Sequence, residues 1–314
     1  MAAPARDAPP VLLLGIGDTH GDLAPLFEAV RRDAQARALL QVGDLTAGKP
    51  GREQGPDDDP AVLASLPVPL VWIHGNHEHW ELLGYDVEAS ISSVSGRPSH
   101  AARAGSPAAD GSPEPAGRPP PAAAQRFQTG TAERRQSGAD GQPPGRDGSA
   151  AVGHPPRGAV KVPGIHLWPG DEYIVPGTAI RIVGLPGNYA PTWFDKEKPF
   201  PGDRVRHFNA ADVAALERFA QPGRRPSVLL MHEAFRGQVR GKIGAMGIPV
   251  LARLVQRLRP DVVLTGHHHV FAVAEHGPTL ALALPRAQDG YVRLWFSPYG
   301  ERRAWDFVPF TAPG

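Results

Sequence analysis

Five short apolar runs in this sequence are each followed by a cluster of Asp, Asn or His residues. The runs have the length and composition of buried strands. In open α/β sheets, ligands bind at the carboxyl ends of the strands. We therefore expect the five clusters to meet at one place, although they are far apart in the chain. In order they are Gly17-Asp18-Thr19-His20, Gly43-Asp44, Gly75-Asn76-His77-Glu78, His232 and Gly266-His267-His268-His269.

Segments with strand-like and helix-like patterns alternate along most of the chain, which predicts an α/β fold. Asn209 is a residue type that caps helices, and it precedes one of the helical segments. Strands are expected at residues 11–17, 38–42, 69–74, 179–184, 227–231, 262–265, 279–284, 291–296 and 304–308, and helices at 22–37, 209–219 and 249–258.

The stretch 92–158 has a different composition from the rest of the chain. Gly and Pro make up about a third of it, and large apolar residues are almost absent. Such a segment buries too little apolar surface to offset the entropy of ordering it. We therefore expect one domain at 10–310, interrupted by a disordered insertion at 92–158.

The composition excludes several classes of protein. The chain has no Cys, which rules out disulfides, thiolate zinc sites, iron–sulfur clusters and cysteine nucleophiles. The formal net charge is only +1, without the large basic excess of a protein that binds bulk nucleic acid. No apolar run approaches the ~20 residues that cross a bilayer, so no membrane association and a cytoplasmic location are expected.

The polar clusters contain enough donors for two metal ions. One divalent ion would not use seven ligands, whereas two ions that share one carboxylate use four bonds each. Paired ions about 3.5–4 Å apart can clamp both oxygens of an in-line displacement at phosphorus. Nitrogen and oxygen donors without sulfur suit Mn, Fe, Zn or Co better than Ca. The oxygen donors are Asp18, Asp44 and Asn76, and the imidazoles are His20, His232, His267 and His269.

This ordered set of motifs resembles the calcineurin-like metallophosphoesterase superfamily. The resemblance implies a four-layer αββα sandwich with its site at the strand ends. It also implies two divalent metal ions, with Mn or Fe favoured and Zn as an alternative, and His77 as the general acid. The implied ligands are Asp18, His20 and His269 for one metal, Asn76, His232 and His267 for the other, and Asp44 as the bridge between them.

The mechanism that this resemblance implies follows from the chemistry of paired dications. They lower the pKa of a bridging water, so that hydroxide forms near neutral pH and attacks phosphorus in line. The metals take up the charge that develops on the phosphoryl oxygens. His77 then donates a proton to the leaving oxygen. The expected substrate is a phosphodiester of a nucleotide or of a small nucleic acid such as RNA.

The second motif differs from that of the protein Ser/Thr phosphatase branch, G-D-x-x-D-R-G. Residues 43–49 lack both its Asp, which orients the catalytic His, and its phosphate-binding Arg. The layout of residues 168–216 is instead similar to the RNA lariat debranching enzymes, although those have Cys where this chain has Asp18. Arg204, Arg206 and Arg240 are candidate phosphate contacts, each with an ordinary solvated Arg as the alternative.

Two other functions stay open at this point. A phosphomonoesterase needs the same metal site, and a metal-poor scaffold of the same fold would bind protein partners instead. All seven ligands and His77 are present, which favours an enzyme. Among the other residues, we expect His74 to pack in the core and Glu78 to accept hydrogen bonds. Tyr189 and Trp193 either stack a base or pack.

Overall fold

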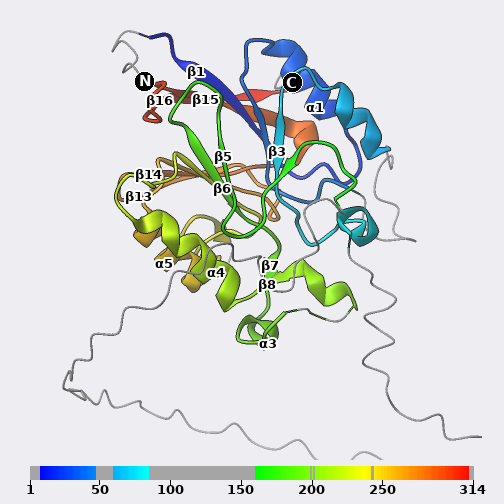
Figure 1. Ribbon diagram of the computed structural model, residues 1–314, viewed down its shortest axis with the longest axis vertical. Coiled ribbons are helices and arrows are strands. Elements are labelled where there is room, and N and C mark those ends of the chain that lie inside the picture. The colour runs from blue at the N-terminus through cyan, green and yellow to red at the C-terminus, as the bar shows by residue number, and fades with distance from the viewer. Residues whose placement is uncertain are drawn as a thin grey trace, which may run out of the picture. The chain divides into compact units, whose positions relative to one another are not determined.

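Two six-stranded mixed sheets form the centre of the structure (Figure 1). The computed structural model describes residues 8–46, 59–84, 160–198, 200, 202–241 and 244–310. In spatial order, sheet A contains β16 (Arg302–Pro309), β15 (Gly290–Phe296), β1 (Val11–Ile16), β2 (Leu39–Gln41), β3 (Leu70–Trp72) and β4 (Ile165–His166). Sheet B contains β13 (Ala272–His276), β14 (Thr279–Ala283), β12 (Val262–Thr265), β9 (Val228–Met231), β6 (Arg181–Leu185) and β5 (Glu172–Ile174).

The helices and the shorter elements complete the described part of the chain. The α-helices are α1 (Ala24–Arg32), α3 (Pro191–Phe194), α4 (Ala210–Leu216) and α5 (Pro249–Leu258). The 3₁₀ helices are η1 (Pro60–Ser65), η2 (Trp80–Leu83), η4 (Gly202–Arg206), η5 (Glu217–Ala220) and η6 (Ala287–Asp289). Two small ribbons pair β7 (Asn188–Tyr189) with β8 (His207–Phe208), and β10 (Arg240–Gly241) with β11 (Gly244–Ala245).

Three apolar clusters separate four layers, in the order helix, sheet, sheet, helix. Leu26 and Val30 of α1 pack on sheet A together with Leu14 of β1. Between the sheets, side chains such as Leu13 and Leu264 face one another. A third cluster joins sheet B to α4 and α5, which lie on its outer side (Figure 1). The predicted αββα sandwich is therefore confirmed.

The strands that carry the polar clusters run parallel within each sheet. In sheet A, β1, β2, β3 and β4 are parallel neighbours. In sheet B, β6, β9, β12 and β14 are parallel neighbours. The carboxyl ends of parallel neighbours lie at one edge, so the residues that follow these strands are brought together. Every predicted strand has its counterpart, but short strands such as β5 and β13 lack a clear pattern in the sequence.

The first helix is shorter than its hydrophobic periodicity predicts. It ends at Arg32, and Asp33 caps it with its N–H on the Ala29 carbonyl. The Asp33 carboxylate is buried and accepts hydrogen bonds from the Tyr291 hydroxyl at 2.6 Å and from Arg293 Nε at 2.7 Å. Those two partners on β15 hold Asp33 against sheet A.

The helix start predicted at Asn209 is confirmed. The Asn209 side chain accepts a hydrogen bond from the Asp212 N–H, and the Asp212 side chain accepts one from the Asn209 N–H. This capping box satisfies two backbone donors that a helix start otherwise leaves without partners.

The described chain stops at Gly84 and resumes at Val160, and the two flanking segments are joined. The Lys161 N–H donates a 2.7 Å hydrogen bond to the Leu82 carbonyl. The predicted insertion 92–158 lies outside the described residues, and the single domain at 10–310 stays a prediction. Among the described residues, no helix is both long and apolar enough to span a membrane.

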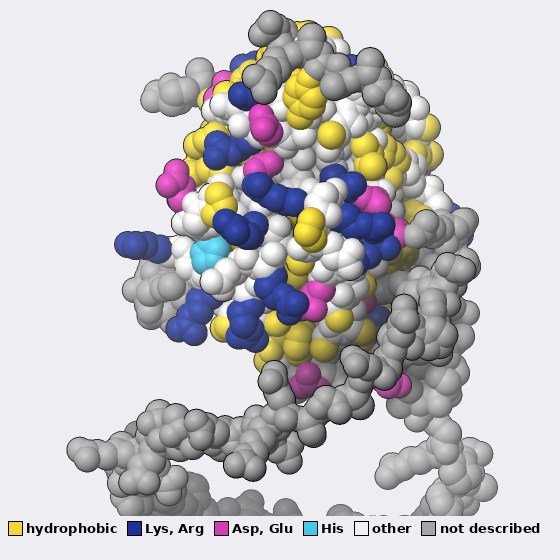
Figure 2. All heavy atoms as spheres, turned by 60° about the vertical axis from the view of Figure 1, so that its left-hand side comes forward, with side chains coloured by type: hydrophobic (Ala, Val, Ile, Leu, Met, Phe, Trp, Pro, Cys, Tyr) yellow, Lys and Arg dark blue, Asp and Glu magenta, His cyan; other side chains and the backbone are white. Residues whose placement is uncertain are grey.

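One face of the molecule carries a local excess of positive charge. Figure 2 shows Lys and Arg side chains gathered over much of this face, with Asp and Glu side chains among them. The net charge of only +1 therefore does not describe the surface locally. A face of this kind attracts anions at short range.

Candidate metal centre

The first group of donors joins the end of β1 to the loop after β12. Donor atoms of Asp18, His20 and His269 all lie within 4.8 Å of one another. The Nε2 atoms of His20 and His269 are 3.0 Å apart, and His269 Nε2 is 3.0 Å from Asp18 Oδ2. Asp18 is buried, whereas the two imidazoles are partly exposed. Two rings and a carboxylate thus converge on one small volume that solvent can reach.

The second group of donors joins the loops after β2, β3, β9 and β12. Donor atoms of Asp44, His232 and His267 lie within 4.8 Å of one another. Asn76 belongs to the same group, because its Oδ1 lies 2.9 Å from His232 Nε2. Sheet A supplies the carboxylate and the amide here, and sheet B supplies both imidazoles.

Asp44 lies between the two groups. Its Oδ1 accepts hydrogen bonds of 2.7 Å from the backbone N–H groups of Asn76 and His77. Its Oδ2 lies 3.5 Å from His232 Nε2 in the second group and 4.0 Å from His20 Nε2 in the first. One oxygen therefore fixes the side chain to the backbone, and the other faces both groups.

Four of these residues have a strained backbone. His20, Asp44, His267 and His269 have φ values between 49° and 67°, and among the described non-glycine residues only Arg259 shares this left-handed conformation. Such a conformation costs roughly 1–3 kcal/mol for a residue with a side chain, and it persists where the surroundings impose it. Its concentration here indicates that the loops are shaped for a function.

Two glycines allow the carboxylates to approach the backbone. A Cβ on Gly266 would lie 2.2 Å from Asp18 Oδ1, and a Cβ on Gly75 would lie 2.1 Å from Asp44 Oδ1. No side chain fits at either distance. The glycines of the Gly-Asn-His and Gly-His-His motifs are therefore required by packing around the acids.

Glu78 links the loop after β2 to the loop after β3. Its fully buried carboxylate accepts hydrogen bonds from the N–H groups of Leu45, Thr46 and Gly75 and from the Thr46 hydroxyl, at 2.9 to 3.1 Å. The expected role as a hydrogen-bond acceptor is confirmed. Burial, with a contribution from the Asp44 charge, raises the pKa of Glu78 to about 7.

His232 is held with one particular nitrogen toward the site. Its Nδ1 donates to the Val42 carbonyl at 2.9 Å, which leaves Nε2 facing Asp44 and Asn76. Burial disfavours a charged ring, but the adjacent Asp44 carboxylate outweighs burial and raises the pKa of His232 to about 10. Without a cation, a proton on Nε2 therefore balances the Asp44 charge.

Glu233 orients the second imidazole of this group and was not predicted from the sequence. Its Oε1 lies 3.3 Å from His267 Nε2. Burial and the charge on His232 lower the pKa of His267 to about 3, so the ring is neutral. When Nε2–H donates to Glu233, Nδ1 keeps its lone pair. A carboxylate behind a metal-binding His fixes the ring in this way.

His77 lies at the first group without belonging to it. Its ring centroid is 5.8 Å from that of His20, and its N–H donates to Asp44. The ring is partly exposed. The imidazole thus lies beside the first group of donors, where solvent reaches it in part.

The other residues singled out in the sequence lie elsewhere. His74 is buried as expected and stacks on His166, with ring centroids 5.2 Å apart. Tyr189 packs against Phe194 and Phe208, so packing rather than base stacking accounts for it. The Lys196 Nζ lies over the Trp193 ring, 4.4 Å from its centroid. Among the candidate arginines, Arg204 and Arg206 lie on η4 and Arg240 on β10.

Gln41 also supports the site without having been predicted. It is fully buried on β2, where its side chain bonds both the N–H and the carbonyl of Gly43. The sequence signal for this role was that Gln41, a polar residue, lies within an apolar strand shortly before the Gly-Asp motif. Glu233, directly after His232, offered a similar one.

The donor set fits divalent cations. Asp18 Oδ1 and His20 Nδ1 are buried without a hydrogen-bond partner, which is costly for polar atoms unless something else satisfies them. Three acidic or amide oxygens and four imidazoles, without sulfur, match Mn, Fe or Zn. The structure thus contains two candidate metal sites that share Asp44.

Comparisons with known proteins agree with this geometry. A family model for calcineurin-like phosphoesterases matches residues 12–119, which include Asp18, Asp44 and His77. No curated protein matches the sequence. One crystal structure matches 96% of this chain over 100% of its own length, at 14% identity and a TM-score of 0.53. The protein TT1561 of Thermus thermophilus matches 96% of this chain and 99% of its own, at 13% identity and a TM-score of 0.52.

The structural similarities show the fold, and the family model covers the first three motifs. The chain matches the calcineurin-like phosphoesterase family over residues 12–119, about a third of its length. It is a metal-dependent phosphoric ester hydrolase.

Cation binding should release a proton. The pKa of His232 in the cation-free protein is about 10, so at pH 7 its Nε2 carries a proton that a cation must displace. The apparent affinity for Mn²⁺ should fall about tenfold for each unit by which the pH is lowered. Isothermal titration calorimetry in two buffers of different ionisation enthalpy will measure the release. A binding heat that is the same in both buffers would contradict the assignment.

Removing Glu233 should weaken cation binding without unfolding the protein. Glu233→Ala is expected to lower Mn²⁺ affinity about 10–100-fold, because His267 loses the group that orients it. Glu233→Gln keeps an oxygen acceptor and should lose less. Mn²⁺ titrations followed by metal analysis will test this, with Glu275→Ala, an exposed acid on β13, as the control. Equal affinity in Glu233→Ala and the wild type would show that Glu233 has no such role.

Proposed function

We propose that the chain hydrolyses a phosphodiester of a nucleotide or small nucleic acid at a two-metal site. The observation that carries this proposal is the position of Asp44 Oδ2, between two groups that each contain further nitrogen or oxygen donors. The proposed ligands are Asp18, His20 and His269 for one ion, Asn76, His232 and His267 for the other, and Asp44 for both.

When bound, the two cations supply Lewis-acid activation of water and neutralise negative charge on the phosphoryl oxygens. The protein's own part is to hold the donors in place before the substrate arrives. Asp44 is fixed by two backbone N–H groups, His232 by the Val42 carbonyl and His267 by Glu233. Little reorganisation is then needed during the reaction, which is how such sites stabilise developing charge.

His77 holds the proton for the leaving oxygen in this proposal. Its backbone N–H is bonded to Asp44, and its ring lies beside the first group of donors. Proton donation by a positioned His contributes about 10²–10⁴ in rate. The ring need not bind a cation for this role.

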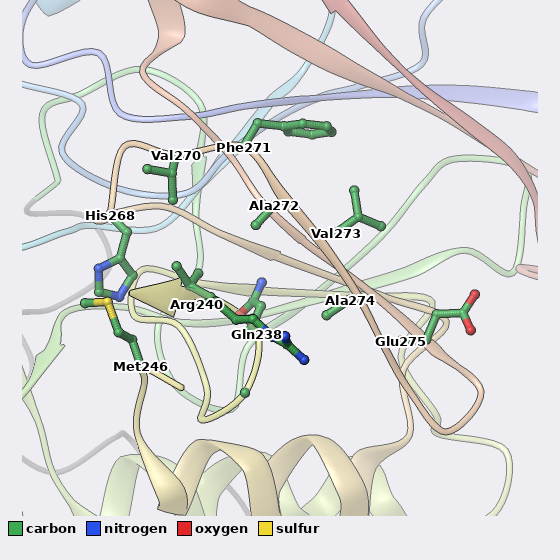
Figure 3. Close-up of a pocket in the computed structure, with 12 residues that line it drawn as sticks. Gln238, Arg240, Met246, His268, Val270, Phe271, Ala272, Val273, Ala274 and Glu275 are labelled. Carbon is green, nitrogen blue, oxygen red and sulfur yellow. The ribbon is translucent and has the colours of Figure 1, made fainter. Parts of the chain in front are cut away.

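A pocket beside the site supports a diester substrate. It has a volume of about 710 Å³, and its lining includes His268, whose ring centroid lies 5.2 Å from that of His267. Figure 3 shows His268 at one end of the pocket and Glu275 at the other. A monoester has no second organic group to place there. A diester has one, and this pocket offers it a surface.

The lining of the pocket favours a nucleoside as that second group. Phe271 stacks on Phe307 with ring centroids 4.4 Å apart and is still 37% exposed, and Met246 and Val270 are also exposed. Arg240 adds a guanidinium to the same wall. Exposed aromatic rings beside cationic side chains are surfaces on which bases stack while phosphates are held. Mn or Fe is the proposed metal, with Zn as the alternative.

Two substitutions distinguish the role of a metal ligand from the role of the general acid His77. Asp44→Ala should lose bound metal and activity together, because both groups of donors lose their shared oxygen. His77→Ala should keep its metal and slow turnover about 10²–10⁴-fold. Metal analysis and hydrolysis of bis-p-nitrophenyl phosphate will measure both. Loss of metal from His77→Ala would show that its assigned role is wrong.

The preference for diesters is tested with paired substrates and added Mn²⁺. We expect a higher kcat/KM for bis-p-nitrophenyl phosphate than for p-nitrophenyl phosphate, and turnover of at least one nucleotide in a panel of cyclic nucleotides, dinucleoside polyphosphates and 2′,5′-linked RNA. Phe271→Ala should lower kcat/KM for that nucleotide about tenfold or more. Tyr299→Ala, a similarly exposed aromatic outside the pocket, is the control. A clear preference for the monoester would identify a phosphomonoesterase.

A further inference from the structure

A guanidinium close to the metal-binding residues can bind phosphoryl oxygens in addition to the cations. The Arg at the second motif of the protein phosphatase branch is absent from residues 43–49. Arg240 lies on the wall of the pocket rather than among the metal-binding residues. The structure places a different Arg, which follows β14, directly against the first group of donors.

Arg286 contacts a proposed metal ligand. Its Nε donates a 3.3 Å hydrogen bond to His269 Nδ1. Arg286 is exposed, and the His269 side chain is 29% exposed, so solvent and ligands reach both. No carboxylate within the described ranges forms an ion pair with Arg286. Its positive charge is therefore available to an anion that binds over the donor groups.

The loop that carries Arg286 is fixed to the strand end that carries Asp18. The Ala287 N–H donates to the Asp18 carbonyl at 3.0 Å. Gln288 donates to Asp22 Oδ2 at 3.0 Å and to the Thr19 carbonyl at 3.4 Å. These bonds set the position of the Arg286 backbone relative to the first group. A guanidinium placed in this way loses less entropy when it binds a phosphate than one on a mobile loop.

The hydrogen bond to His269 is compatible with only one arrangement of the ring. A neutral imidazole has one N–H and one lone pair. With Nδ1 accepting from Arg286, Nε2 carries the proton and faces Asp18 Oδ2 at 3.0 Å.

We propose that Arg286 binds the phosphoryl oxygens of the substrate. This inference rests on the proposed two-metal phosphoesterase function and names a further substrate-binding residue of the same site. The guanidinium has several N–H donors in a plane and matches two phosphate oxygens at once. Lys at this position would keep the charge without the paired geometry.

Binding of inorganic phosphate to the full-length, Mn²⁺-loaded protein tests this proposal without depending on turnover. Arg286→Ala should weaken phosphate binding about 10–100-fold in calorimetric titrations, as expected for loss of a charge-assisted contact. Arg286→Lys should recover part of the loss. Arg303→Ala, an exposed Arg on β16 that pairs with Glu301, should bind phosphate like the wild type. Metal analysis of each variant accompanies the titrations.

Two results would overturn the assignment. Arg286→Ala with full metal content and phosphate affinity within about twofold of the wild type would exclude Arg286 as a phosphate ligand. Loss of metal from Arg286→Ala would show that Arg286 supports the metal site instead. Failure of the proposed function alone would give a different result, namely a wild-type protein that hydrolyses no ester but still binds phosphate through Arg286. Absence of phosphate binding by the loaded wild type would overturn both.

Discussion

The arrangement of the site depends on the two oxygens of the Asp44 carboxylate having different partners. Oδ1 is held by two consecutive backbone N–H groups, and Oδ2 lies within 4.0 Å of an imidazole from each group of donors. A carboxylate that was free to rotate would serve one group or the other. Because the loop after β3 supplies the N–H groups, the third motif positions the second. This dependence explains why Gly75 must lack a side chain and why Glu78 joins the same two loops.

Negative charge is balanced locally in this centre. The buried Asp44 carboxylate keeps its pKa below the usual range, because the positive charge on His232 outweighs the cost of burial. His267 beside it stays neutral. A site with one proton and several nitrogen donors is already arranged for exchange of that proton for a metal ion.

Much of the fold and the list of donors could be predicted from the sequence, because both follow from local patterns. Apolar runs predicted strands such as β1 and β12, and the polar residue after each run predicted where a site would form. The pattern did not show that helix α1 ends early, because Asp33 is held by partners on β15, far along the chain. Boundaries set by such distant contacts have no local signal.

The supporting residues were harder to find for the same reason. Glu233 and Arg286 act on His267 and His269, and neither belongs to a motif that the sequence displays. Their roles depend on distances between loops of different strands.

The role of each ligand and of His77 also stays a prediction, since proximity alone does not assign chemistry. Arg204 and Arg206, candidates from the segment 168–216 that is similar to the lariat debranching enzymes, lie on a 3₁₀ helix.

The hydrogen bond between Lys161 and Leu82 has a consequence for how the length of this chain can change during evolution. The described segments on either side of residues 85–159 are neighbours here, so the two ends of that stretch lie close together. The entropy of closing a loop grows only with the logarithm of its length. Residues can therefore be gained or lost between these points at little cost to the packing of the sheets. This junction is a place where new sequence can accumulate while the metal-binding loops stay unchanged.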